Sequence, residues 1–496
     1  MNYRARICWF LLINLLVGIL IGIFIGGTSG NASRSRQALR EEMPGGEYEA
    51  YLPLIVRNHI APAPLWRFGA ARARRSLLDY PQADIAGLRL GWYVDWTVTP
   101  DAPRPYGIEY IPTVRVKQWK LLDSSTWTTC CVDCPYVQVG GRYTYTVSPS
   151  WEVIQTAARL NPGMLWVIGN EIERRDWGQG YCARQDEILP EVYAIAYHET
   201  RQAILSVDST ARFAIGGVIQ ATPLRLQYLE RVWSAYQQYY GELMPVDVWN
   251  VHAFVLQEKR GEWGADIPAG LKDEAGMLYS VLDNREFSIA WEHIRAFREW
   301  MKQKGQQDKP LIITEYGVNM PPHYSGFSPE EVRDHFMYPS FQHFLNQTDT
   351  DIGYPDDGYR LVQRWNWYSL DDDSGRYNAQ GVYEQFFNGN LFYSGYGPNP
   401  MGLSPLGRYW RDYVKGLPSA SEPPYTVTEL PQSVFQISGE RVEDGKAHQG
   451  KCAGRWVRLI FTAPSPSNAF LGNSETEASQ PISEEMVCLS TFSDQQ

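Results

Sequence analysis

The chain has 496 residues, which is enough for one large domain with additions or for two to three ordinary domains. Hydrophobic residues make up 44% of it and charged residues 20%, so it can form a sizeable core. The formal net charge of −11 argues against nucleic acid or an anionic membrane surface as a partner. The 18 Trp and 31 Tyr residues suit surfaces that stack on flat sugar faces, and they suit plain burial in a large core equally well.

The first 32 residues have the pattern of a targeting segment. Arg4 and Arg6 precede an uncharged, mostly apolar run from 7 to 27, and the small residues at 30–32 offer a cleavage site for a signal peptide. The run is also long enough to remain as a membrane anchor with its positive end inside. Either alternative predicts an exported protein, secreted or held at the cell surface, whose only membrane contact is this segment. Residues 33–64 are expected to be a linker.

Between residues 65 and 417, short apolar runs alternate with longer segments of helical period. This alternation is typical of repeated βα units and predicts an α/β fold, a (β/α)8 TIM barrel with inserted loops. An open doubly wound sheet is the alternative, but the Gly-rich turn expected after its first strand is missing. The eight runs expected to form the barrel strands are Trp66–Ala71, Leu88–Trp96, Tyr110–Val116, Leu165–Asn170, Arg212–Val218, Val246–His252, Leu311–Glu315 and Leu361–Trp367.

Several local signals place helices and insertions around these runs. Ser328 to Glu331 reads as a capping box with Pro at the first helical position. Residues 117–147 are too long for one loop, and two β-like runs flanking Gly140-Gly141 predict an inserted hairpin there. Residues 403–414 are expected to be the closing helix. The tail, 418–496, is rich in Pro, Ser, Glu and Gln, and it reads as a linker, a small module or disorder, with one candidate strand at Trp456–Thr462.

The seven cysteines fall into groups. Cys8 lies in the leader, whereas Cys130, Cys131, Cys134 and Cys182 lie on adjacent predicted loops. In an exported protein these four favour disulfides, and a structural zinc bound by four thiolates is the alternative. The tail cysteines at 452 and 488 are a candidate second staple.

Two apolar runs end on a glutamate. Leu165–Asn170 is followed by Glu171, and the run from Leu311 reaches Glu315. Runs without polar alternation read as strands buried on both faces, and the carboxyl ends of parallel strands meet on the face where α/β folds build active sites. Two carboxylates on one face are what cleavage of a glycosidic bond requires, because repulsion between them lets one keep its proton while the other is ionised.

At these residues the chain resembles the clan A retaining glycoside hydrolases. Asn170-Glu171 matches the Asn-Glu pair that ends strand 4 in that clan, and Glu315, within Thr-Glu-Tyr-Gly, matches the glutamate that ends strand 7. The resemblance implies that Glu171 is the acid/base and Glu315 the nucleophile. It extends to the strand 6 segment ending in His252 and to the strand 8 segment with Trp367, which it implies is the sugar platform.

Further residues are candidates for binding the substrate. We expect Asn170 to donate to the sugar 2-hydroxyl, and His252 either to orient Glu315 or a sugar hydroxyl or to be structural. Arg115 is expected either to hydrogen-bond the nucleophile or to neutralise a buried acid. Trp92 and Trp96, in a segment similar to one in the glycosidase family that includes β-1,3-glucanases, are expected to stack on sugar or to pack in the core.

These observations predict an exported glycoside hydrolase that cleaves an oligo- or polysaccharide by a retaining mechanism with two glutamates, a β-glucan being one candidate substrate. No metal or organic cofactor is required. The run Asp371-Asp372-Asp373 reads as a solvated acidic loop, with Ca²⁺ binding as the alternative. A hydrolase using a metal near that loop is a further alternative, and so is a non-catalytic carbohydrate-binding or cell-surface protein on the same scaffold.

Overall fold

The computed structural model describes residues 65–175, 184–318, 320, 326–372, 389–393 and 402–418, and the backbone of 376–377, 383–384, 437–441, 455–462 and 481–489. The predicted leader and linker, residues 1–64, lie outside these ranges. Within these ranges, no helix has both the length and the apolar character needed to cross a bilayer.

Each of the eight apolar runs overlaps a strand, which confirms the predicted positions with ends shifted by a few residues, but the run Tyr110–Val116 is divided between two strands. Six strands form one parallel sheet in the order β12-β13-β14-β1-β2-β3, and β11-β10-β4 form a second parallel sheet that β9 extends in the antiparallel direction. The strands are β1 Leu65–Ala70, β2 Leu90–Tyr93, β3 Glu109–Tyr110, β4 Thr113–Gln118, β9 Tyr145–Ser148, β10 Leu165–Asn170, β11 Arg212–Gly217, β12 Trp249–Ala253, β13 Leu311–Tyr316 and β14 Arg364–Trp367.

The two sheets contact each other at both ends. The chain passes from β3 directly into β4 through Ile111 and Pro112, and the Val167 amide of β10 donates to the Pro112 carbonyl at 3.0 Å. Pro has no N–H to continue a ladder, so a break in the strand falls at this residue. At the other end, a parallel bridge joins Ala214 of β11 to Val248, which directly precedes β12. The strand order therefore continues from one sheet into the other.

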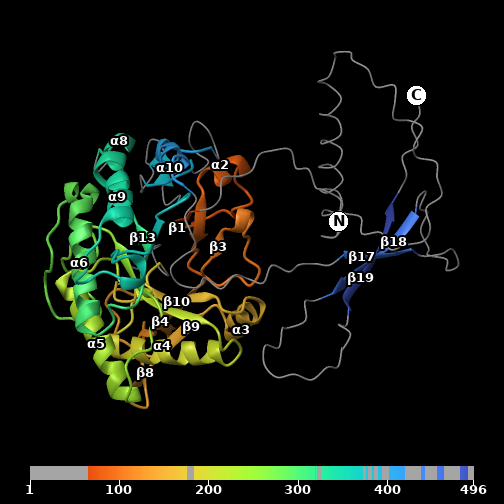
Figure 1. Ribbon diagram of the computed structural model, residues 1–496. Coiled ribbons are helices and arrows are strands. Elements are labelled where there is room, and N and C mark those ends of the chain that lie inside the picture. Colours follow the sequence, from red (N-terminus) through yellow and green to blue (C-terminus); the bar gives the residue numbers. More distant parts are fainter. Residues whose placement is uncertain are drawn as a thin grey trace, which may run out of the picture. The chain divides into compact units, whose positions relative to one another are not determined.

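Helices follow the strands and lie outside them (Figure 1). The capping box predicted at Ser328 and Glu331 is confirmed at the start of α8, and Gly241 ends α5 in a left-handed conformation. The helices are α2 Gln82–Gly87, η1 Pro105–Gly107, α3 Trp151–Leu160, α4 Pro190–Leu205, α5 Pro223–Tyr240, η2 Leu282–Arg285, α6 Phe287–Gln303, α8 Pro329–Val332, η3 Arg333–Met337, α9 Tyr338–Asn346, η4 Pro355–Asp357 and α10 Pro405–Lys415.

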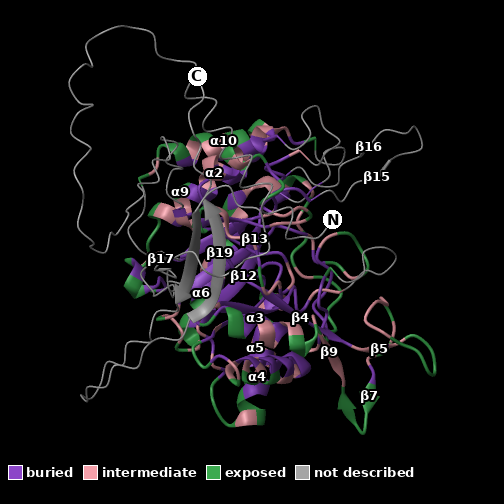
Figure 2. Cartoon of the chain, turned by 90° about the vertical axis from the view of Figure 1, so that its right-hand side faces the viewer, coloured by how far each residue is buried: buried purple, intermediate pink, exposed green. Residues whose placement is uncertain are grey.

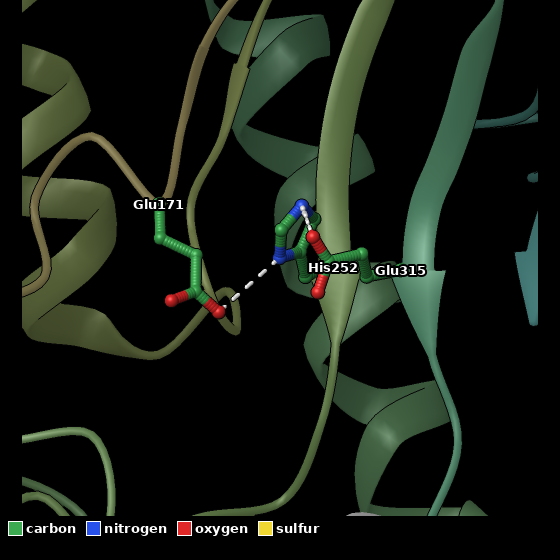
Figure 3. A group of neighbouring side chains, drawn as sticks. All are labelled: Glu171, His252 and Glu315. Carbon is green, nitrogen blue, oxygen red and sulfur yellow. Dashed lines mark ion pairs between the residues drawn. The ribbon is translucent and has the colours of Figure 1, made fainter. Parts of the chain in front are cut away.

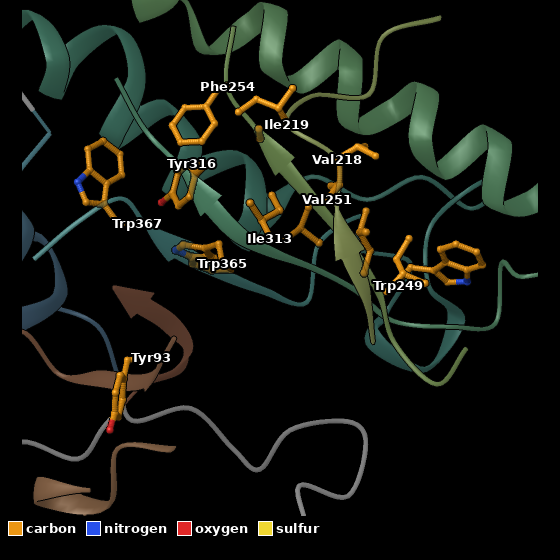
Figure 4. Packing of buried hydrophobic residues seen from close by; sticks show 14 of the residues in the cluster. Tyr93, Val218, Ile219, Trp249, Val251, Phe254, Ile313, Tyr316, Trp365 and Trp367 are labelled. Atoms are coloured by element: carbon orange, nitrogen blue, oxygen red, sulfur yellow. The ribbon is translucent and has the colours of Figure 1, made fainter. Parts of the chain in front are cut away.

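Buried side chains form two clusters. The larger cluster joins the strands to the helices; the rings of Trp249, Tyr316, Trp365 and Trp367 belong to it (Figure 4). The smaller cluster is lined by residues of both sheets and contains no helix residue: Ala71, Trp92, Val94, Ile111, Leu165, Val167, Ala214, Val248 and Ile312. Because strand side chains alternate between two faces, β2, β10, β11 and β13 each supply residues to both clusters.

The insertion between β4 and α3 is built from short hairpins. β5 (Lys120–Leu121) pairs with β6 (Trp127–Thr128), and β7 (Gln138–Val139) pairs with β8 (Arg142–Tyr143). The predicted hairpin is thus confirmed, with Gly140 and Gly141 at positive φ in its turn. Figure 2 shows its exposed tip at β7. The second predicted run, Tyr143–Val147, is divided: Tyr143 lies in β8, and the residues from Tyr145 lie in β9, which pairs with β4.

A disulfide joins Cys131 to Cys134 in this insertion, and Cys130 is also disulfide-bonded. Disulfides are therefore confirmed for this group, and these thiols are not available for the alternative zinc site. Cys182 lies outside the described residues.

Strands also occur beyond the central sheets. β15 (Arg376–Tyr377) pairs with β16 (Tyr383–Glu384), and the closing helix is confirmed as α10. In the tail, β17 (Ile437–Arg441), β18 (Arg455–Thr462) and β19 (Pro481–Leu489) form an antiparallel sheet, which confirms the strand predicted at Trp456–Thr462. Cys488 lies on β19, and Cys452 lies outside the described residues.

Candidate active site

Glu171 is held at the end of β10 by a sharp turn of the backbone. Its φ of +47° lies in the left-handed region, which a side-chain-bearing residue seldom adopts without a constraint from its surroundings. Gly169 has φ +94°, and a Cβ there would lie 2.4 Å from Cγ2 of Ile172. Ile172 is therefore able to return to the core, and the turn leaves the Glu171 carboxylate at the strand end.

Glu315 is placed by a bulge in β13. Val251 of β12 lies opposite Ile313, but the next residue, His252, lies opposite Glu315, so Thr314 is an extra residue in the pairing. A bulge of this kind re-aims the side chains that follow it. Here it brings Glu315 beside His252, where its carboxylate accepts a hydrogen bond from the Trp96 indole.

His252 lies between the two glutamates (Figure 3). Its Nδ1 is 3.6 Å from a Glu171 carboxylate oxygen, and its Nε2 is 3.8 Å from one of Glu315. One oxygen of each glutamate and one ring nitrogen all lie within 4.8 Å of one another. Gly217 of β11 leaves the room for this ring, because a Cβ there would be 2.5 Å from the imidazole Cδ2.

The surroundings shift the pKa values of the two carboxylates in opposite directions. Burial alone would raise the pKa of Glu171, but the Arg174 guanidinium at 2.9 Å and His252 outweigh it and lower that pKa to about 2. Burial raises the pKa of Glu315 to about 7; negative Glu171 adds to this rise, while His252 and the Trp96 donor oppose it. At neutral pH Glu171 is therefore ionised, and Glu315 keeps its proton to a higher pH than an ordinary glutamate.

The same three side chains carry groups of the kind that bind metal ions, so we considered a metal centre. Arg174 already supplies the positive charge at Glu171 and also donates to the Gly264 carbonyl at 2.9 Å. His252 directs Nε2 to the Thr314 hydroxyl at 3.1 Å. With one carboxylate neutralised and one ring nitrogen engaged by protein groups, the arrangement fits proton chemistry better than metal ligation.

Asn170 and Arg115 lie beside this trio and share one partner. The Asn170 amide N–H and the Arg115 Nε–H both donate to Asp186, at 2.8 and 2.7 Å. Arg115 thus neutralises a buried acid, which is one of the two roles expected for it. Through these two hydrogen bonds Asp186 also links β4 to β10. The Asn170 side chain donates to the Arg184 carbonyl at 3.4 Å, a long contact that leaves its predicted role toward a sugar hydroxyl a proposal.

Aromatic rings cover the site on the β14 side. Trp96 lies 5.6 Å from Tyr368, centroid to centroid, and Tyr368 lies 6.1 Å from Phe254. Glu315 is among the charges that raise the pKa of Tyr368, after burial and Asp372, so this phenol lies close to the carboxylate pair. Tyr368 is the aromatic residue that the sequence interpretation missed.

Trp367 and Trp92 do not lie at the site. Trp367 is fully buried, donates to the Gly389 carbonyl, and packs 5.2 Å from Tyr316 in the cluster between strands and helices (Figure 4). The predicted sugar platform at Trp367 therefore needs correction: adjacent strand residues face opposite sides, so Tyr368 lies beside Trp96 and Glu315, whereas Trp367 packs in the core. Trp92 fills the smaller cluster beneath Arg364, as its core alternative predicted.

The acidic run after β14 is not a solvated loop where the structure describes it. Asp371 is buried and accepts from the Arg74 amide at 3.1 Å. Asp372 is also buried and accepts from the Tyr368 hydroxyl. Both carboxylates therefore accept hydrogen bonds from neighbouring protein groups. Asp373 lies outside the described residues.

Arg174 was also missed. It stands three residues after Glu171, a spacing at which a turn returns a long side chain to the carboxylate, so the Glu-x-x-Arg pattern was an available signal. The Asp186 contact, by contrast, joins residues 16 positions apart and has no local signal.

Comparisons with known proteins give weak likenesses. No family model matches the chain, and neither does any curated protein. Among solved structures, a family 128 endo-β-1,3-glucanase from Sorangium cellulosum is 16% identical, with a TM-score of 0.39 over 70% of this chain and 97% of that one. A glucosidase from Croceicoccus marinus is 10% identical, with a TM-score of 0.39 over 86% and 83%. A family 44 xyloglucanase from Paenibacillus polymyxa is 12% identical, with a TM-score of 0.31 over 54% and 57%. Similarity at this level assigns neither a fold nor an activity.

The opposite pKa shifts of Glu171 and Glu315 predict that replacing each one by glutamine changes folding stability in opposite directions. The pKa of Glu315 is about 7 in the folded chain against an ordinary 4.5, so folding stability falls as the pH rises through this interval. Glu315→Gln should therefore stabilise the protein at pH 8, on the order of 3 kcal/mol, and give no such gain at pH 4. Denaturant unfolding at both pH values measures this.

Glu171→Gln is the matched control of opposite sign. Its folded pKa of about 2 lies below 4.5, so Glu171 contributes stability above pH 4.5 that is lost as the pH falls toward 2. This variant should be less stable than the parent at pH 8. If both variants shift stability in the same direction at that pH, the assigned charge states are wrong.

Proposed function

We propose that the chain is an exported glycoside hydrolase of the retaining type that cleaves an oligo- or polysaccharide. One observation carries the proposal: buried carboxylates from the ends of β10 and β13 each place an oxygen within 4.8 Å of the other. Retaining enzymes need carboxyl groups about 5–5.5 Å apart, whereas inverting enzymes leave roughly 6.5–9.5 Å for a water. The separation here favours a covalent intermediate.

The scaffold proposed for this chemistry is a (β/α)8 barrel. Three features support it: the two parallel sheets meet at both ends, a cluster lined only by strand-side residues of both sheets fills the space between them, and helices lie outside. In such a barrel the ends of β10 and β13 open on the same face, where active sites occur.

The proposed mechanism uses the two glutamates in turn. Glu315 attacks the anomeric carbon while Glu171 protonates the departing oxygen, and Glu171 then takes a proton from the water that releases the sugar. The pKa shifts of the two side chains run against these roles, because Glu171 is held ionised and Glu315 retains a proton up to about pH 7. Glu315 must therefore lose its proton, and Glu171 must receive one, before the reaction.

Export and substrate class belong to the same proposal. The leader-like first 32 residues support export, and so does the disulfide in the insertion, because disulfides persist in oxidising compartments. The protein is then secreted or anchored at the cell surface, with carbohydrate as its partner. The segment Leu90–Trp96, with its similarity to a β-1,3-glucanase segment, makes β-1,3-glucan the first substrate to test.

Azide rescue tests the roles of the two carboxylates. Glu315→Gly should lose turnover and recover it with azide as a glycosyl azide of inverted configuration, because azide replaces the nucleophile. Glu171→Ala should lose about 10²- to 10⁴-fold and give a retained azide product from aryl glycosides. NMR of the products measures this, with the exposed surface change Glu152→Gln as control.

Two results would contradict the proposal. If Glu315→Gly is as active as the parent, Glu315 is not the nucleophile. A well-folded parent that binds glycans but cleaves none of a broad panel would favour the carbohydrate-binding alternative. Loss of parental activity with a chelator would instead favour the metal-dependent hydrolase.

The position of Tyr368 beside Trp96 and Phe254 predicts that substitutions at Tyr368 and Trp367 have different effects. Tyr368→Ala should lower kcat/KM about 10-fold, since stacking on one ring is worth about 1–1.5 kcal/mol, and it should also lower stability because buried Asp372 loses a donor. Trp367→Phe should lower stability and leave KM near the parental value, because its ring packs in the core. Steady-state kinetics and thermal unfolding of both variants measure this, and the reverse pattern would restore Trp367 as the platform.

The acid limb of the pH profile tests Glu315 as nucleophile. Because its pKa is about 7, the ionised form that attacks becomes common only as the pH rises through 7. The kcat/KM of the parent should therefore rise through about pH 7 and not near pH 4. A limb at pH 4 to 5 would mean that the raised pKa does not belong to the attacking group.

A further inference from the structure

A chain of hydrogen bonds runs behind the catalytic pair, from β11 through β12 to β13. The Asn250 side-chain Nδ2–H donates to the Ile215 carbonyl at 3.1 Å. The Thr314 amide N–H donates to Asn250 Oδ1 at 3.2 Å, and the Thr314 hydroxyl lies 3.0 Å from the same oxygen. His252 Nε2 lies 3.1 Å from that hydroxyl. All the side chains are buried, so water does not compete for these bonds.

The direction of each bond follows from the one before it. A backbone N–H can only donate, so the Asn250 atom that faces Thr314 is the acceptor oxygen. The Thr314 hydroxyl must then point its single hydrogen at this oxygen. Its lone pairs are left to face His252, so the ring nitrogen Nε2 must carry a hydrogen and donate it.

The other ring nitrogen is thereby left facing Glu171. Nδ1 is 3.6 Å from the Glu171 carboxylate, and no closer hydrogen-bond partner exists for it among the described residues. In the neutral ring Nδ1 would present a lone pair to a carboxylate, which is unfavourable in a buried site. A proton placed between these two atoms removes the conflict.

We propose that Asn250 and Thr314 are positioning residues that hold the hydrogen of neutral His252 on Nε2, so that Nδ1 stores the acid proton of Glu171. This inference rests on the proposed function, because the stored proton is the one that Glu171 delivers.

The bulge in β13 makes this arrangement possible. In a regular strand, Thr314 and Glu315 would face opposite sides of the sheet. Because the pairing shifts at His252, both consecutive residues reach the same imidazole, the hydroxyl at 3.1 Å and the carboxylate at 3.8 Å. The same bulge therefore places the nucleophile and orients the proton store.

The proton balance closes over one turnover. Once Glu315 has lost its proton, the imidazolium carries a hydrogen on both nitrogens, and both glutamates are ionised. When substrate is bound, the Nδ1 proton moves to Glu171 and then to the glycosidic oxygen, whose bond to the anomeric carbon breaks as Glu315 bonds to that carbon. Glu171 next removes a proton from water, whose oxygen displaces Glu315, and this proton returns to Nδ1.

The groups around His252 support a stored positive charge. Glu171 and Glu173 face it from the end of β10, and Glu315 faces it from β13. Burial alone would lower the pKa of His252, but these carboxylates outweigh burial and raise it. Arg174, bound to Glu171, is the nearby cation, and it keeps Glu171 ionised until the proton is needed.

Thr314→Val and Thr314→Ser provide the test. Valine has nearly the same shape but no hydroxyl, so His252 can turn its hydrogen to Nδ1, and the store is lost. We expect Thr314→Val to lower kcat/KM at least about 10-fold for a substrate whose leaving group needs protonation, and to leave an activated aryl glycoside nearly unchanged. The alkaline limb of its pH profile should move to lower pH. Thr314→Ser should behave as the parent.

A second readout does not depend on activity. Imidazole ¹⁵N chemical shifts of labelled protein, assigned with His252→Gln, should show hydrogen on Nε2 at every pH in the parent and in Thr314→Ser, and on Nδ1 in neutral His252 of Thr314→Val. Nδ1–H in the neutral parent overturns the inference, as does a valine variant that loses both substrates equally. If the parent cleaves no glycan, the proposed function fails and the storage role with it, while the shifts still decide the tautomer.

Discussion

The structure depends on keeping two buried carboxylates close together. Glu171 and Glu315 place oxygens within 4.8 Å of each other, where two full negative charges would repel strongly. Arg174, His252 and the Trp96 indole each face one of these oxygens, and burial keeps Glu315 protonated up to about pH 7. The site is therefore a balance of charge in which each neighbour fixes where a proton can lie.

That balance is held in place by a second group of buried charges. Arg225 of α5 donates to Glu173, two residues after Glu171, at 2.8 Å, and also to Glu258 and to the Ala265 carbonyl at 2.8 Å. These partners belong to the loops that follow β10 and β12. A buried pair of this kind adds little net stability, but removal of one partner leaves an uncompensated charge. Here the contacts of Arg225 fix the turn that carries Glu171 against the loop after β12, whose Gly264 carbonyl accepts a hydrogen bond from Arg174.

The strands and both glutamates were predictable because their signals are local. An apolar run that ends on a carboxylate in the sequence forms a strand with that carboxylate at or near its end, as Leu165–Glu171 and Leu311–Glu315 illustrate. The choice between Trp367 and Tyr368 was not predictable, because it depends on which face of β14 meets the mouth, and bulges in the neighbouring pairing shift that face. Arg115 and Asp186 meet through tertiary structure alone, so a residue without a local signal decided between the two roles expected for Arg115.

The pKa shifts of Glu171 and Glu315 oppose their proposed roles, and this opposition has a physical use. A Glu171 that kept its own proton would need an apolar pocket, and such a pocket would disfavour the carboxylate that must later take a proton from water. With Arg174 and His252 beside it, Glu171 is stable as a carboxylate. In the proposed arrangement its acid proton is held on Nδ1 of His252, 3.6 Å from the carboxylate. A substrate that excludes water strengthens the attraction between that proton and the departing oxygen, so delivery is tied to occupancy of the site. The positive charge next to Glu171 thus restricts when it acts as an acid rather than preventing it.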